Sequence, residues 1–198
     1  MLFYLLSTSA GEVLTMIGAL VLGLPLPVAA VQILWINLVT DTALVIPLGL
    51  EPAERHAMKT PPRDPKAPIL DPVMIVRMVL VAAVMASAAL ATFHYLLQNH
   101  TTEYARTVTF SVLVVCQWAN ALNARAEVAS AFSRLRVPNK SLAFGLSAAL
   151  VMQILALTIL APLLYLVPVA WTDVVLYSAL GAVAVIAVSE LHKLTVRR

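Results

Sequence analysis

Charged residues are scarce in this sequence of 198 residues, because Lys, Arg, Asp and Glu together occupy 12% of its positions. Ordinary soluble domains carry about twice that share, so the chain lacks the material for a normal water-facing surface. Cysteine occurs once, as Cys116 within an apolar run. A single cysteine excludes an internal disulfide framework and a CxxC metal pair.

Apolar residues, in contrast, are abundant. Hydrophobic residues make up 61% of the chain, and its mean hydropathy is +0.92. A globular core of this size could not hide so much apolar surface from water, since small domains leave a large part of their area exposed. The composition therefore predicts an all-α polytopic membrane protein with the lipid bilayer as its solvent.

Runs long enough to cross a bilayer, about 20 residues each, occur six times between turn residues and charged clusters. We expect one domain over residues 1–198, a bundle of six transmembrane helices at about 2–22, 28–50, 73–97, 107–124, 141–166 and 172–192. The first run does not read as a signal peptide, because it has no basic N-terminal region and contains Ser7, Thr8, Ser9 and Glu12.

Basic residues gather on one side of this predicted topology. If the six helices alternate, only Arg106 falls on the other side, and the remaining twelve share one: Arg55, Lys59, Arg63, Lys66, Arg77, Arg125, Arg134, Arg136, Lys140, Lys193, Arg197 and Arg198. The positive-inside rule places that side, with both termini, in the cytoplasm. The net charge of +3 thus reflects topology, and no nucleic-acid partner is expected.

Two carboxylates lie well inside predicted spans, and ionisable groups there are functional candidates because they are costly to insert. Glu12 follows Thr8 and Ser9 at helical spacing, so these side chains are expected on one face of the first helix. Asp41 is grouped in the same way with Asn37 and Thr40 in the second helix. Carboxylate, amide and hydroxyl oxygens on adjacent antiparallel helices are ligands suited to a hard cation. The alternative is that both carboxylates are buried only as interhelical hydrogen-bonding groups.

Five stretches of the sequence resemble a known family. The run Val31–Asp41 is similar to the sixth transmembrane helix of type II P-type ATPases, the calcium-pump group, and Gly49–Pro52 with Met58–Arg63 to the loop after it. Tyr4–Val13 resembles the fifth helix of that family and Asn120–Asn123 the end of the eighth. The resemblance implies the C-terminal membrane region of a cation pump, from the fifth helix to the tenth.

The resemblance also implies a ligand set for a transported cation: Glu12, Asn37, Thr40 and Asp41, with Ser9 and Gln117 at two further ligand positions. Ser9 stands where calcium pumps carry asparagine, Gln117 where they carry glutamate, and Leu44 where they carry proline. These departures weaken one of the two sites that calcium pumps have. We expect Ca²⁺ as the transported cation, one ion per cycle, with Mn²⁺ or Na⁺ as open alternatives.

Several motifs of such pumps are absent from the sequence, namely the phosphorylated Asp-Lys-Thr-Gly, the nucleotide-binding domain, the Thr-Gly-Glu loop and Pro-Glu-Gly-Leu-Pro. ATP and Mg²⁺ would therefore bind in other domains, and we expect a fragment, split subunit or degenerate relative that works with partner domains in a bacterial plasma membrane. Two alternatives stay open: a stand-alone structural or regulatory membrane protein, and an ion transporter that does not use ATP.

Overall fold

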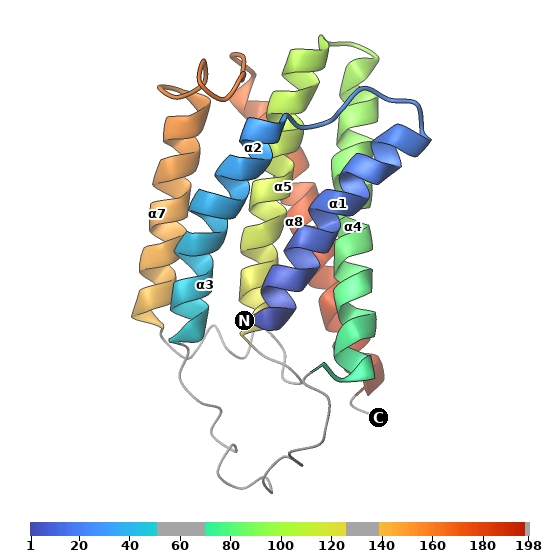
Figure 1. Ribbon diagram of the computed structural model, residues 1–198, viewed down its shortest axis with the longest axis vertical. Helices are drawn as coiled ribbons and strands as arrows, with labels where there is room; N and C mark the ends of the chain where they lie inside the picture. The colour runs from blue at the N-terminus through green and yellow to red at the C-terminus, as the bar shows by residue number, and fades with distance from the viewer. Residues whose placement is uncertain (51–69, 126–138, 197–198) are drawn as a thin grey trace, which may run out of the picture.

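The computed structural model describes residues 1–50, 70–125 and 139–196, which form a bundle of six long helical segments and contain no strand (Figure 1). The segments are α1 (Leu2–Val21), a rod of α2 (Ala30–Trp35), η1 (Ile36–Asp41) and α3 (Thr42–Gly49), α4 (Pro72–Leu97), α5 (Thr102–Ala124), α7 (Lys140–Leu157) and α8 (Trp171–Val196). The all-α prediction is confirmed.

Three of the helices begin at side-chain caps that the sequence encodes. The side chain of Asp71 accepts from the amide of Val73 at the start of α4, where Pro72 occupies the first turn. Thr101 caps α5, and Asn139 accepts from the amide of Leu142 at 2.8 Å at the start of α7. A capping oxygen satisfies an amide that has no partner within its helix.

Two predicted helix boundaries differ from the structure. The helix expected over 141–166 ends at Leu157; residues 158–165 form turns, and residues 166–170 have no regular structure. Pro162 is consistent with the early end, because it has no amide hydrogen for the carbonyl of Thr158 four residues earlier, and its ring would clash with that carbonyl in a helix. The helix expected from 107 begins at Thr102, since the Thr101 cap starts it one turn before the apolar run.

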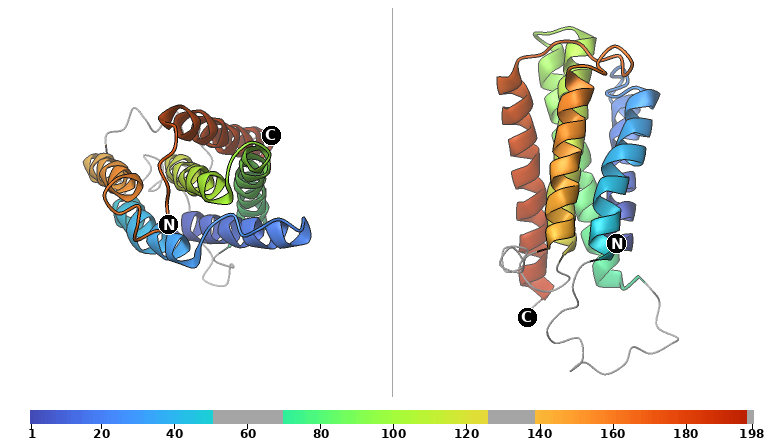
Figure 2. Two further views of the ribbon diagram at one scale, coloured as in Figure 1. Left: turned by 90° about the horizontal axis from the view of Figure 1, so that it is seen from above. Right: turned by 90° about the vertical axis from the view of Figure 1, so that its left-hand side faces the viewer.

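Helix α5 lies in the middle of the bundle, with the other helices around it (Figure 2). Among the described residues, five segments have the length and apolar composition of a membrane span: α1, the rod over Ala30–Gly49, α4, α7 and α8. Helix α5 is not among them, although six spans were expected. It buries most of its side chains, polar ones included, and a helix enclosed by protein does not need an apolar surface of its own. The chain is an integral, multi-pass membrane protein.

The helices alternate in direction, so that α1, α4 and α7 begin at the end of the bundle where α3, α5 and α8 finish (Figure 1). Residues 51–69 and 126–138 lie outside the described part of the chain. These ranges include the motif Met58–Arg63 and six of the basic residues that predicted the orientation: Arg55, Lys59, Arg63, Lys66, Arg134 and Arg136.

Candidate functional site

Helix α1 carries a stripe of buried polar side chains: Tyr4, Ser7, Thr8, Glu12 and Thr15. Their spacing of three or four residues places them on one face of the helix. The hydroxyls of Ser7, Thr8 and Thr15 donate to backbone carbonyl oxygens one turn earlier, as hydroxyls inside membrane helices commonly do. Glu12 is the carboxylate on this stripe, and it takes its donors from other helical segments.

Asn37, Thr40 and Asp41 lie within a π-helical segment, η1, which interrupts the second membrane-spanning rod. In a π-helix the backbone hydrogen bonds run from residue i to i+5, and such segments are frequent at functional sites. Thr40 and Asp41 are buried at the end of η1, whereas Asn37 at its start is exposed. The wider turn therefore separates residues that an α-helical reading of the sequence had placed on one face.

Glu12 accepts hydrogen bonds from two amide side chains on different segments. The Nδ2 of Asn37 on η1 lies 3.0 Å from Oε2 of Glu12, and the Nε2 of Gln117 on α5 lies 2.7 Å from Oε1. Glu12 is 5% exposed and Gln117 is fully buried. Three helical segments thus meet at a single carboxylate inside the bundle.

The second carboxylate also meets α1. The phenol oxygen of Tyr4 donates to Oδ1 of Asp41 across 2.9 Å, and both residues are buried. Contacts thus run both ways between α1 and η1, since each segment supplies one carboxylate and one donor to the other. This exchange fixes the two carboxylates on facing helices, as the sequence had predicted.

The oxygen atoms around this cluster suit a hard cation. Besides the two carboxylates, Oε1 of Gln117 is buried and has no hydrogen-bond partner within the described part of the chain. A buried acceptor without a donor is costly, and a cation would satisfy it. No three His, Cys, Asp or Glu side chains gather into a metal-binding group within residues 1–50, 70–125 and 139–196. Neutral oxygens would therefore have to complete any coordination shell here.

The predicted ligands fall into two groups. Glu12, Asn37 and Gln117 are joined by hydrogen bonds, and Asp41 and Thr40 are buried one turn further along the rod. Ser9, however, is exposed, while its neighbours Ser7 and Thr8 are buried. The buried face of α1 passes through residues four and eight before Glu12, so position 9 points away from it.

Two contacts of the cluster were not predicted from the sequence. Tyr4 stands two helical turns before Glu12 and reaches Asp41, and Asn120 on α5 donates to the hydroxyl of Ser7 at 2.7 Å. Asn120 lies three residues after Gln117, which is a spacing that places two amides on one face of a helix. That spacing was the available signal, whereas nothing in the sequence marked Tyr4 beyond its place on the polar stripe.

Comparisons with known proteins point in one direction. A family model described as "Cation transporting ATPase, C-terminus" matches residues 25–195. A calcium-transporting ATPase of Bacillus subtilis is 37% identical over 135 residues, covering 66% of this chain and 15% of the relative. Calcium-transporting ATPase 1 of Bacillus cereus is 30% identical over 174 residues, which cover 80% of this chain and 20% of the relative. An endoplasmic reticulum calcium ATPase of Aspergillus fumigatus is 28% identical over 232 aligned residues, covering 98% and 24% respectively. The chain therefore spans a quarter or less of the length of these relatives.

Proposed function

The chain belongs to the cation-transporting ATPase family, whose C-terminal membrane region it matches, and from that premise we propose that it holds the transported cation of an ATP-driven pump. The observation that carries this proposal is the placement of Glu12, where amides from η1 and α5 converge on one buried carboxylate. Such a carboxylate at membrane depth is a candidate for ion binding rather than for packing.

The proposed ligands are Glu12, Asn37, Thr40, Asp41 and Gln117. In the arrangement described, the amides of Asn37 and Gln117 point their nitrogens at Glu12. A cation entering the cluster would reverse both amides, so that their oxygens and the carboxylates face the ion. The same rotation would give Oε1 of Gln117, now without a donor, a partner of positive charge.

Ca²⁺ is the proposed cargo. Two carboxylates neutralise a divalent ion, and oxygen ligands of this kind are those that Ca²⁺ prefers. The names of the relatives from Bacillus subtilis and Aspergillus fumigatus, which are calcium-transporting ATPases, support the same choice. Gln117 supplies no negative charge, and Ser9 is exposed, so we propose one ion per cycle.

The energy for transport would come from other pump domains, or from a partner chain, which bind ATP and Mg²⁺. Alternating access driven by those domains would open the Glu12–Asp41 cluster first to one side of the membrane and then to the other. We further propose that the chain lies in a bacterial plasma membrane with both termini in the cytoplasm, because the positions of its basic residues favour that orientation.

Binding of Ca²⁺ to the chain in lipid nanodiscs tests this function directly. Saturable ⁴⁵Ca²⁺ binding is expected in the unaltered protein, and it should weaken at least about tenfold in Glu12→Gln and Asp41→Asn, because each removes one ligand charge. Glu103→Gln, which changes an exposed carboxylate at the far end of α5, is the control and should bind normally. Equal binding in Asp41→Asn and the unaltered chain would refute the site, and competition by Mn²⁺ or Na⁺ would reassign the ion.

The orientation is tested separately with cysteines placed on a Cys116→Ala background. Lys140→Cys and Glu103→Cys both lie at exposed positions near opposite ends of the bundle. In intact cells a membrane-impermeant maleimide should label position 103 and leave position 140 unlabelled until the membrane is opened. The reverse pattern would invert the proposed topology.

A further inference from the structure

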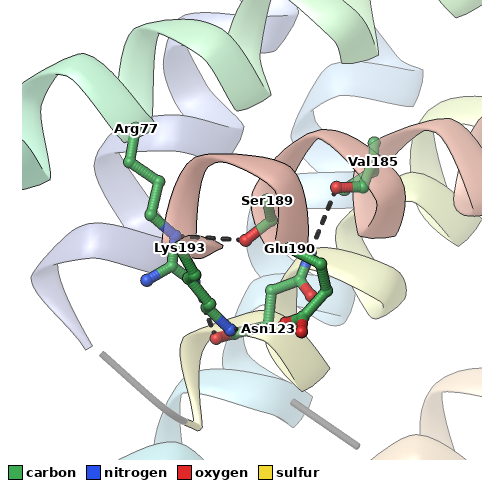
Figure 3. Close-up of polar contacts among 6 residues, drawn as sticks. All are labelled: Arg77, Asn123, Val185, Ser189, Glu190 and Lys193. Atoms are coloured by element: carbon green, nitrogen blue, oxygen red, sulfur yellow. Dashed lines mark hydrogen bonds and ion pairs between the residues drawn. The ribbon is translucent and has the colours of Figure 1, made fainter. Parts of the chain in front are cut away.

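Arg77 lies near the start of α4 and contacts residues of α8, α5 and α1. Figure 3 shows its side chain beside Ser189 and Asn123. Its side chain is buried, with 6% of the residue exposed. Its Nε donates to the hydroxyl of Ser189 on α8 at 3.1 Å, and one terminal nitrogen donates to the carbonyl oxygen of Asn123 on α5 at 2.9 Å. The guanidinium carbon also lies 4.4 Å from the ring centroid of Phe3 on α1.

The contact with Asn123 fixes the final turn of α5. This helix ends at Ala124, and the carbonyl of Asn123 is among the last four, which have no amide partner within the helix; it accepts from the amide of Arg125, just beyond the helix, as well as from Arg77. A cation at that position is favoured both as a hydrogen-bond donor and by the negative end of the helix dipole. Arg77 therefore caps α5 from a neighbouring helix and holds the C-terminal end of α5 at a fixed position along the helix axis.

The same helix presents three amides at intervals of three residues. Asn123 donates to the carbonyl of Val185 on α8, Asn120 to Ser7 on α1, and Gln117 to Glu12 on α1. Gln117 stands six residues before Asn123, which is about 9 Å along the helix axis. A shift of the capped end along this axis would move the Gln117 amide against Glu12 by a similar amount, since a helix is stiff over two turns.

We propose that Arg77 is a positioning residue of the cation site, because it holds both helices that meet at the Glu12–Gln117 hydrogen bond. It contacts α5 through the Asn123 carbonyl and α1 through the Phe3 ring, and these two contacts carry the positioning, while the bond to Ser189 is an additional contact with α8. The role in cation binding rests on the function proposed above, whereas the role in aligning α5 with α1 does not.

The first measurement reads that alignment without any cation. Glutamine labelled with ¹⁵N marks four side-chain amides, at Gln32, Gln98, Gln117 and Gln153, and the Gln117→Ala variant assigns the resonance of interest. In Arg77→Met the Gln117 resonance is expected to move while that of Gln32, near the opposite end of the bundle, stays in place. Ser189→Ala is the matched control, because it removes one bond of Arg77 and leaves the bond to Asn123 available.

The second measurement reads cation binding. Arg77→Met should weaken Ca²⁺ binding roughly fivefold, and adding Arg77→Met to Gln117→Ala should have a much smaller effect, since residues that act through one contact are not additive. A purely structural arginine would lower thermal stability and give additive changes in affinity.

The outcomes separate the two proposals. If the unaltered chain binds no cation, the proposed function fails and the Gln117 resonance still tests the alignment. If the resonance is unchanged in Arg77→Met, or moves equally in Ser189→Ala, the positioning role is overturned. If Arg77→Met does not fold, Arg77→Lys replaces it, because lysine lacks the fixed fork of donors. The Gln117 resonance should then move more in Arg77→Lys than in Ser189→Ala. An equal or smaller movement overturns the proposal.

Discussion

The hydroxyl of Tyr4 donates a hydrogen bond to the carboxylate of Asp41 at 2.9 Å, and it is a second bond between α1 and η1, beside the one between Glu12 and Asn37. The two bonds place both intramembrane carboxylates against a donor on the opposite helix. They also connect two helices that otherwise pack on different neighbours: α1 packs mainly on α4, and α3 packs mainly on α7.

Replacing Tyr4 by Phe removes this donor and little else. Asp41 is then left buried with one hydrogen bond fewer, which is expected to destabilise the folded state by about 1–3 kcal/mol. Thermal unfolding of the purified chain in detergent measures the effect. Tyr95→Phe, at a side chain that is 54% exposed, should unfold like the unaltered protein, and a Tyr4→Phe protein as stable as this control would contradict the prediction.

Gln32 ties the start of the second rod to the turns after α7. Its Nε2 donates to the carbonyl of Leu164 at 3.0 Å, and its Oε1 accepts from the amide of Ala29. In Gln32→Leu both backbone groups lose this partner, so amide hydrogen exchange should become faster over residues 158–170. Gln98→Leu changes an exposed glutamine and should leave exchange in that segment unaltered; equal rates in all three proteins would show that Gln32 does not hold the segment.

Gly145 allows α7 to lie directly on α3. Pro47 has no amide hydrogen to offer the carbonyl of Ala43 four residues earlier, and a Cβ added at Gly145 would overlap that carbonyl and come within 2.8 Å of the proline ring. Gly145→Ala is expected to cost about 1–3 kcal/mol of stability through overpacking. Ala143→Val adds bulk at an exposed position of the same helix and should be nearly neutral in the same unfolding assay. A neutral Gly145→Ala would mean that the two helices can separate freely.

Cys116 is a built-in probe of the bundle interior. It is fully buried on α5, and a Cβ added at Gly181 of α8 would lie 2.7 Å from its Sγ. The folded chain should therefore resist maleimide until SDS unfolds it, and Gly181→Ala should accelerate labelling by forcing the two helices apart. Ala179→Val, on the exposed side of α8, supplies the comparison. Rapid labelling of the unaltered protein would contradict the buried position of Cys116.

Composition was sufficient to predict the helical membrane fold, because the requirement to match apolar surface to lipid acts on every segment. It was less informative for α5, whose polar residues such as Thr107, Ser111 and Asn120 are buried against other helices. Their burial depends on which helices surround α5, and that arrangement is a property of the whole bundle. Pro162 was the available signal for the early end of α7. It was overlooked because the residues around it are apolar and suggested a continuous span.

The candidate site was predictable as far as its carboxylates and amides. Glu12, Asn37 and Gln117 were expected to meet, and the structure joins them by hydrogen bonds. The π-turn of η1 was not predictable, because sequence periodicity assumes the α-helical spacing throughout a segment. Ser9 was predicted on the same face as Glu12 for a simpler reason. In a helix, the residues three and four positions before Glu12, Ser9 and Thr8, both lie near its side chain. In the bundle Thr8 is buried and Ser9 is exposed.

The polar character of α5 also decides how the chain can enter a membrane during synthesis. Helix α5 is less apolar than the other long helices, so it gains less from lipid when it leaves the translocation channel. Helix α4 precedes it across a short connection, Gln98–Thr101, and is strongly apolar. We therefore expect the pair to be inserted as one hairpin, in which α4 shields the polar side chains of α5 from lipid.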